Sequence, residues 1–584
     1  MVADESPFVT KLDTNYVPSP AEVTLIKNWV STSQHMLKGL DSQMLDLQKR
    51  REAMADQVER HQALLSPIRR VNVDVLLLIF QIYCEEAHHY SKPDMLEPPL
   101  VLASVCRGWR QLVWSNPLLW KVVVLAIPGL KHNPREDEDR PMPSLERFRA
   151  IMERKLAKLN LWLERSALSP LVVSLHAGSF PSEGLEAVRW EQFRFLQHHL
   201  IGRLLLHSKR WYEVTLKVPR YLSRAIAVAI QVPAIDIPIL RSFSLLTAAE
   251  FDNQPGTPDS FSIRNPLDVF FCAPSLQALC IRQRGDHHNL PVPWSRLTEL
   301  DIYSSFYSGL GSLTDNNILF ILSSACPSLR TCRVAFQLTI DSGEPLMCLV
   351  FPNLESLSLS IDSRELMVSQ TSASMRRLGY AFATTPKLKN FSVWWSDYYG
   401  RALAKWPFFG PLSADCALEN LTFCLSIQDS AMVHALRLLS SLTSLEVHCL
   451  PLTTLRSAIA ALTPTGAGSS VLCSRLTQVT VVIWWDADTD LEEALITFAS
   501  ARVNSELQRA NGYVGLKSLI VRSEHRPHDP SIEQIRYLEG SGLSIQWEYR
   551  CHEEHNTELY CPPVELVPLE TSRPVQGLIY PFRV

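Results

Sequence analysis

The feature that most constrains the fold of this chain is a short apolar pattern that recurs through its C-terminal two thirds. It reads Leu-x-x-Leu-x-Leu, with Ile, Val, Phe or Cys as substitutes, and it usually follows a turn residue. Weaker copies begin at Trp211 and Leu240, and nine good copies are Leu276/Leu279/Ile281, Leu297/Leu300/Ile302, Leu329/Cys332/Val334, Leu354/Leu357/Leu359, Leu388/Phe391/Val393, Leu418/Leu421/Phe423, Leu442/Leu445/Val447, Leu476/Val479/Val481 and Leu516/Leu519/Val521. A unit this small cannot bury its apolar face alone, so neighbouring copies must stack. The sequence therefore predicts a ladder of short parallel strands.

The spacing of these copies resembles that of an irregular leucine-rich repeat. Several copies open with a proline turn, at Pro274, Pro327, Pro352 and Pro386, and the intervals between first leucines run from 21 to 40 residues. Intervals above the usual ~20 to 29 imply insertions on the side away from the strands. Apolar stretches at 318–322 and 432–439 supply candidate return helices. The resemblance implies a leucine-rich-repeat solenoid over residues 144–550, preceded by an exposed, proline-containing linker at 128–143 and followed by a proline-rich tail or cap at 551–584.

A second pattern covers residues 20–65, where apolar side chains alternate steps of three and four. The seam runs from Val23 to Leu65 through Leu37, Leu40, Met44 and Leu47. This is a heptad pattern, which predicts one long amphipathic helix. Residues 1–19 before it are expected to be disordered.

Both ends of the predicted helix have a physical reason. Ser19 is a candidate N-cap, and Pro67 ends the helix. Polar Ser33, Arg51 and His61 interrupt the seam. Two partners for the seam stay open: the body of the same chain, or a second copy in a homodimer.

Residues 66–127 carry the most specific motif. The sequence PIRRVNVDVLLLIF is followed, after a polar insertion, by PPLVLASVCRGWRQLVWSNPLLWK. This segment resembles an F-box, in the form found in a large fungal family where a heptad helix runs into an LSPIRR motif. The matching positions that the resemblance assigns to adaptor binding are Pro67, Ile68, Leu76, Ile79, Phe80, Val105, Cys106, Trp109, Leu118 and Trp120. Val71-Asn72-Val73-Asp74 stands where that family usually has Leu-Pro-Pro-Glu.

The resemblance implies a function without catalysis. An F-box protein of this kind is the substrate receptor of a Skp-cullin-F-box ubiquitin ligase: the F-box binds the Skp adaptor, the repeats bind a protein client, and the ligase supplies the chemistry. Trp109 and Trp120 are the candidate aromatic anchors, although Trp109 could equally belong to the core. The alternative is a repeat scaffold that never joins a ligase and uses these helices as an internal cap.

Composition excludes several other classes. The net charge of -4 offers no basic field for nucleic acid. No apolar run approaches the ~18 residues of a membrane span. Asp4 and Glu5 are unlike a secretory signal, so we expect a cytoplasmic or nuclear protein. The 13 cysteines include no CxxC pair, and Cys280, Cys332 and Cys424 are expected to be buried free thiols.

No motif for catalysis or a cofactor is recognisable. The sequence has no phosphate-binding glycine loop and no nucleophile elbow, and it contains only 21 glycines. Ligand-type residues gather at Cys551, His552, His555 and Cys561, but their spacing matches no common zinc module. We therefore expect no enzyme activity, no cofactor and no metal.

Period-two alternation names the candidate client site. In each strand the residues beside the second and third leucines face the exposed side of the sheet. Tyr303, Arg333, Trp394 and Trp484 are the strongest candidates, because aromatic residues and arginine are enriched at binding hot spots. Each of the two tryptophans adjoins another, Trp395 or Trp485, so one of each pair could instead cover the end of the core. Other residues that the rule selects include Arg282, Asp301, Glu446, His448 and Arg522.

Overall fold

The computed structural model describes residues 6–90, 98–127, 145–177, 187–218, 226, 236–246, 267–282, 290–303, 313–339, 348–363, 368–382, 384–396, 403, 406–408, 417–425, 427–448, 452–466, 471–483, 489–523 and 527–549. These residues fall into two compact units. The first ends at Val113 and the second begins at Trp114.

The first unit begins with the expected long helix, α1 (Pro20–Leu65), whose start is fixed by a capping box. The backbone N–H of Ser19 donates to the Glu22 carboxylate at 2.8 Å, and the Glu22 N–H donates to Ser19 Oγ at 3.5 Å. The first of these bonds is the main cause that lowers the pKa of Glu22 to about 2. A 3-10 turn, η2 (Pro67–Arg70), follows the helix, as the proline predicts.

The described part of the segment before α1 begins at residue 6. It forms the 3-10 turn η1 (Val9–Lys11). The Lys11 ammonium lies 3.9 Å from the centre of the Tyr16 ring, and the Tyr16 hydroxyl donates to Glu22 at 2.9 Å. The capping carboxylate therefore also ties the preceding turn to the helix, which composition alone did not reveal.

Short helices complete the first unit: α2 (Val73–Tyr90), α3 (Pro98–Val105) and α4 (Arg107–Ser115), of which the last runs into the second unit. The N-terminus of α2 forms without the prolines of the F-box pattern. Asn72 accepts the N–H of Asp74 on its side-chain oxygen at 2.9 Å, and its carbonyl accepts the N–H of Leu76. An Asn cap with an acidic residue in the first turn replaces the proline start.

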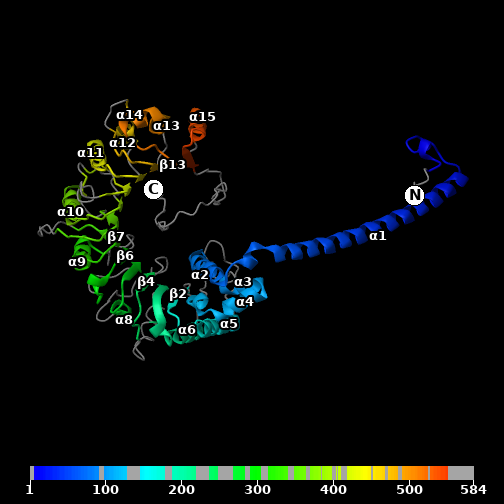
Figure 1. Cartoon of the computed structure of the whole chain (residues 1–584), viewed down its shortest axis with the longest axis horizontal. Helices are drawn as coiled ribbons and strands as arrows, with labels where there is room; N and C mark the ends of the chain where they lie inside the picture. The colour runs from blue at the N-terminus through cyan, green and yellow to red at the C-terminus, as the bar shows by residue number, and fades with distance from the viewer. Residues whose placement is uncertain are drawn as a thin grey trace. The chain divides into compact units, whose positions relative to one another are not determined.

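The second unit is built on one parallel sheet with the strands in chain order (Figure 1). Within the described residues the strands are β1 (Val122–Ile127), β2 (Leu171–Ala177), β3 (Trp211–Lys217), β4 (Ser242–Leu246), β5 (Ala278–Arg282), β6 (Glu299–Tyr303), β7 (Thr331–Gln337), β8 (Ser356–Asp362), β9 (Asn390–Ser396), β10 (Asn420–Cys424), β11 (Ser444–His448), β12 (Gln478–Val482), β13 (Ser518–Ser523) and β14 (Ser544–Tyr549). The expected boundary after residue 127 is therefore too late, because β1 pairs with β2 and belongs to the sheet.

Helices or 3-10 turns lie between many of the successive strands, and the helices are on the outer side of the sheet in Figure 1. They are α5 (Leu145–Arg165), α6 (Ala187–Leu205), α8 (Asp268–Phe271), α9 (Asp315–Ala325), α10 (Val368–Ala381), α11 (Asp429–Leu438), α12 (Leu452–Leu462), α13 (Thr489–Val503), α14 (Ser505–Asn511) and α15 (Asp529–Gly540), with 3-10 turns η3 (Pro117–Trp120), η4 (Ser208–Arg210) and η6 (Trp294–Arg296). The prediction of an α/β repeat with a long N-terminal helix and a parallel strand ladder is confirmed.

The recurring pattern forms the core. All three apolar residues of each of the nine copies are buried, and the second and third stand in register with their counterparts on the next strand: Leu357, for example, pairs with Phe391 and then Leu421. Each such side chain contributes roughly 1.5–3 kcal/mol before the entropy cost of ordering. Of the thiols expected inside, Cys332 is buried, whereas Cys280 and Cys424 are only partly buried because they occupy outward positions of β5 and β10.

A second device joins consecutive repeats at their turns. In five of the nine good copies, the residue just before the first leucine donates a side-chain hydrogen bond to a carbonyl of the preceding repeat. The pairs are Ser275 to Pro238, Arg296 to Pro274, Ser328 to Leu297, Asn353 to Pro327, and Ser441 to Leu418, at 2.7 to 3.1 Å. We call these bonds the turn stitches. They satisfy carbonyls that no strand pairs.

A buried arginine holds the C-terminal repeats together. Arg502 on α13 has no exposed surface, and its guanidinium donates to the carbonyls of Leu462, Leu472 and Cys473 at 2.6 to 3.2 Å. Cys473 adopts a positive φ of 49°, which a non-glycine residue rarely does. The guanidinium thus fixes a strained turn between α12 and β12.

Replacing Arg502 with Met should therefore destabilise this region by about 2–4 kcal/mol, because three buried carbonyls would lose their donors. Hydrogen–deuterium exchange of β12 and β13 should accelerate, and the melting temperature should fall. The control is Arg509→Met on the exposed side of α14. This variant should change the exchange rates and the melting temperature only slightly. Equal exchange rates in the two variants would contradict a structural role for Arg502.

Candidate protein-interaction surfaces

The first candidate surface is an apolar face of α2. Val75, Leu78, Ile79 and Ile82 are each 45 to 54% exposed, whereas Leu76, Phe80 and Cys84 on the opposite side are buried. Val105, at the end of α3, is a further apolar side chain of this unit that is 57% exposed. We call the four exposed residues of α2 the α2 face. A contiguous exposed patch of apolar side chains commonly marks a site where another protein binds.

The predicted adaptor-binding residues include exposed, half-buried and buried side chains. The exposed ones are Pro67, Ile68, Ile79, Val105, Cys106 and Leu118, of which Leu118 belongs to the second unit. Leu76 and Phe80 are buried. Trp109 is half-buried, and its ring meets that of Phe80 edge-on, with centroids 4.7 Å apart. Trp109 therefore holds α4 against α2 while keeping part of its surface open.

Trp120 is not available as an aromatic anchor, contrary to the prediction. It has no exposed surface. Its ring stacks on Trp114 at 5.0 Å and meets Trp162 of α5 edge-on at 4.8 Å. The Arg165 guanidinium lies 4.6 Å from the centre of the Trp114 ring. This aromatic cluster joins η3 to α5, so Trp120 is a core residue of the sheet unit.

The second candidate surface is the exposed side of the sheet. Tyr303, Arg333 and Trp394 lie there as the alternation predicts, each half-buried. Tyr303 of β6 and Trp394 of β9 stand in the same row across the strands, and Arg333 of β7 stands in the adjacent row. Trp484 lies outside the described residues. Of the pair Trp394 and Trp395, Trp395 is the one that covers the end of the core. It is buried and donates its indole N–H to Ser363 Oγ at 2.7 Å.

Trp394 belongs to a polar and aromatic cluster on this side of the sheet. Its ring centroid lies 4.5 Å from that of His448 on β11. The Nε2 atom of His448 is 2.9 Å from Glu446 Oε1, and the Arg522 guanidinium lies 4.0 Å from the same oxygen. Arg522 also donates to Glu548 of β14 at 2.8 Å. We call Trp394, Glu446, His448, Arg522 and Glu548 the Trp394 cluster.

Sequence reasoning missed one member of this cluster. Glu548 lies on β14, where the strand reads Ser-Ile-Gln-Trp-Glu-Tyr and lacks the leading leucine spacing of the other repeats. The alternation of Leu543, Ile545 and Trp547 could have revealed it. The remaining members face outward, as the alternation rule selects them.

The electrostatics of the cluster favour an ionised Glu446. Its pKa is lowered, first by the hydrogen bond with His448 and then by the charges of His448 and Arg522 and a bond from Thr422. The carboxylate is therefore negatively charged at neutral pH. With the imidazole and the guanidinium beside it, the cluster offers donors, acceptors and an aromatic ring on one rigid sheet.

The described residues offer little else of a chemical kind. Across them, no group of three or more His, Cys, Asp or Glu side chains is gathered to hold a metal ion. In the same part of the chain, no helix is both long and apolar enough to cross a membrane. The Cys and His residues at 551–561 lie outside the described residues.

The Glu446 interaction predicts a pH dependence of stability. Because its folded pKa lies below the unfolded value near 4.5, the carboxylate stabilises the fold fully above that pH, and this contribution is lost as pH falls through the folded pKa. The melting temperature of the Glu446→Gln variant should lie below that of the native chain at pH 7, and the gap should narrow below pH 4.5. A gap that widens on acidification would contradict this assignment.

Comparison with known proteins leaves the family open: no protein-family model matches the chain, and no curated protein matches it. The two surfaces therefore carry the functional interpretation. One is apolar and helical, the other polar and aromatic on a rigid sheet. Both are suited to binding other proteins.

Proposed function

We propose that this chain is the substrate receptor of a Skp-cullin-F-box ubiquitin ligase. The observation that carries the proposal is the α2 face, where apolar side chains stay exposed within a motif that resembles an F-box. In this proposal the α2 face and Val105 bind the Skp adaptor, and the ligase supplies the catalytic chemistry. The receptor itself then needs no cofactor and no catalytic residue, and it acts in the cytoplasm or nucleus.

The physical support comes from the cost of leaving this face uncovered. Four branched or long apolar side chains on one helix, each about half exposed, gain roughly 25 cal/mol for each Å² that a partner covers. The face is also rigid, because Phe80 and Trp109 pack behind it. A preformed apolar helix face needs little ordering when it binds, which favours a stable complex.

The strand array is, in the same proposal, an irregular leucine-rich repeat that binds a protein client on its exposed side. The leucine pattern and the helical returns support this assignment, and insertions on the outer side accommodate the intervals that exceed the usual ~20 to 29 residues. The client site is centred on Trp394 of β9, with Arg333 two strands away on β7 and Tyr303 three strands away on β6. Trp and Arg are among the residue types that dominate binding energy at interfaces.

A scaffold that never joins a ligase remains the second candidate. The observation in its favour is the burial of Phe80 and Trp120, two aromatic positions of the F-box-like motif that serve the core instead of a partner. In that case the helical unit would only cap the repeats, and the α2 face would cover another segment of the same protein. The two candidates differ in whether the Skp adaptor is bound.

The adaptor prediction is tested in the full-length chain by Ile79→Asp. A charge in the middle of the α2 face should weaken binding of the purified Skp adaptor at least ~tenfold, because it would be desolvated at the centre of the interface. The measurement is isothermal titration calorimetry.

The matched control is Leu168→Asp, because Leu168 is 89% exposed in the turn before β2 and lies outside the proposed interface. It should leave the affinity unchanged. A native chain that shows no affinity for the adaptor would exclude the ligase role and leave the scaffold.

The client site is tested by the double variant Trp394→Ala and Arg333→Ala. Proteins that are enriched with the native chain in proximity labelling should be lost with the variant, while adaptor binding stays the same. The melting temperature should fall only slightly, since both side chains are half-buried on the open side of the sheet. The control is Arg437→Ala in the last turn of α11, away from the strands. A variant that keeps the same proteins would place the client site elsewhere.

A further inference from the structure

The exposed seam of α1 is the apolar surface that the proposed function leaves unused. The side chains of Val30, Leu37, Leu40, Met44, Leu47, Met54 and Val58 are each 40 to 68% exposed. They repeat in heptad steps on one side of a helix of 46 residues. An amphipathic helix of this length normally buries such a seam against another helix.

We propose that α1 pairs with α1 of a second copy as an antiparallel two-stranded coiled coil. The pairing follows from the polar residues that interrupt the seam. In a parallel, in-register dimer, each seam residue meets its own copy, so Arg51 would meet Arg51 in the core. Like charges would then stand opposite each other at the same layer without a counter-charge, which is unfavourable.

The antiparallel register removes this conflict. If Leu37 lies opposite Leu47 of the second copy, then Met44 lies opposite Leu40, Val30 opposite Met54, and Ile26 opposite Val58. In the same register Arg51 lies opposite Ser33. Arg51 of each copy thus lies opposite Ser33 of the other copy, which gives two such polar pairs in the dimer. The apolar seam residues between these two positions lie opposite apolar residues. A polar pair of this kind specifies the register of a coiled coil.

The flanking charges give a parallel dimer no compensating advantage. In a parallel dimer, oppositely charged residues that flank the seam would pair between the two copies when they are five residues apart in the sequence. In α1 this pair is Glu22 and Lys27 of the second copy. Glu22 is already engaged, because it accepts hydrogen bonds from Ser19 and Tyr16 and an ion pair from Lys11. Two other ion pairs, Arg50 with Asp46 and Arg60 with Asp56, form within the helix itself.

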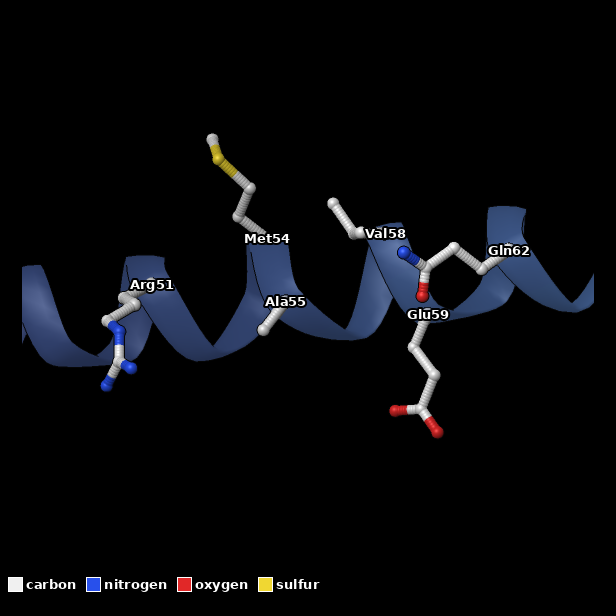
Figure 2. Close-up of a pocket in the computed structure, with 6 residues that line it drawn as sticks. All are labelled: Arg51, Met54, Ala55, Val58, Glu59 and Gln62. Carbon is white, nitrogen blue, oxygen red and sulfur yellow. The ribbon is translucent and has the colours of Figure 1, made fainter.

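The conformation of Arg51 fits a position at the edge of the seam. Figure 2 shows Met54 and Val58 projecting from one side of the helix, while the Arg51 guanidinium turns toward the side of Ala55 and Glu59. A long side chain can bury its aliphatic stem in the seam and keep its charged end in water. Facing a small residue such as Ser33 leaves room for this arrangement.

The first test is the mass of the full-length chain by sedimentation over a micromolar concentration series. The native chain should be a dimer. Leu40→Asp should weaken the dimer at least ~tenfold, because it places a charge in a central layer. Ser42→Asp, on the outer side of the same turn of helix, should leave it unchanged. A native chain that stays monomeric at tens of micromolar would overturn the proposal and assign the seam to the body of the same chain.

The second test separates the two orientations with a matched pair at Ser33. In the antiparallel dimer Ser33→Glu faces Arg51 and should tighten association about fivefold, whereas Ser33→Lys should loosen it by a similar factor. In a parallel dimer both changes place like charges opposite each other, so both should loosen it. A dimer that both variants weaken would therefore overturn the antiparallel assignment while leaving the dimer itself.

Discussion

Each strand of the sheet depends on the strands before and after it, and this mutual dependence governs the second unit. Backbone groups of one strand are satisfied by its neighbours in a continuous parallel register, and the leucines beneath them pack in matching rows. A single repeat on its own has no neighbouring strand to pair with and no leucine row to pack against, so the repeats fold only as a stack. The open side of the sheet is then free to carry residues that the core does not constrain.

The fold was largely predictable from the sequence because its periodicities are local. Three buried leucines per repeat and seven-residue steps in α1 can be counted along the chain. The first and last strands were harder: β1 follows the F-box-like motif directly, and β14 lacks the leading leucine. Their strand character depends on pairing with β2 and β13, which is a contact between distant segments.

The candidate sites were predictable in position but not in detail. Alternation placed Tyr303, Arg333 and Trp394 correctly on the open side, because side-chain direction in a strand has period two. It could not show that Trp394 meets His448, or that Arg522 links Glu446 to Glu548, since these pairs form only in the folded sheet. Trp120 was mistaken for a surface anchor because its partner, Trp162, lies on a helix beyond the linker.

The turn stitches have a consequence for how such a chain can diverge. Each stitch fixes a turn directly to the turn before it, so the spacing of the strands is set at that point and not by the length of chain in between. Residues can then be added to or removed from the outer connections with little penalty to the sheet. The good copies that are joined in this way to another good copy stand 21 to 32 residues after it and their strands stay in register, and such joints allow new outer surfaces to evolve on an unchanged framework.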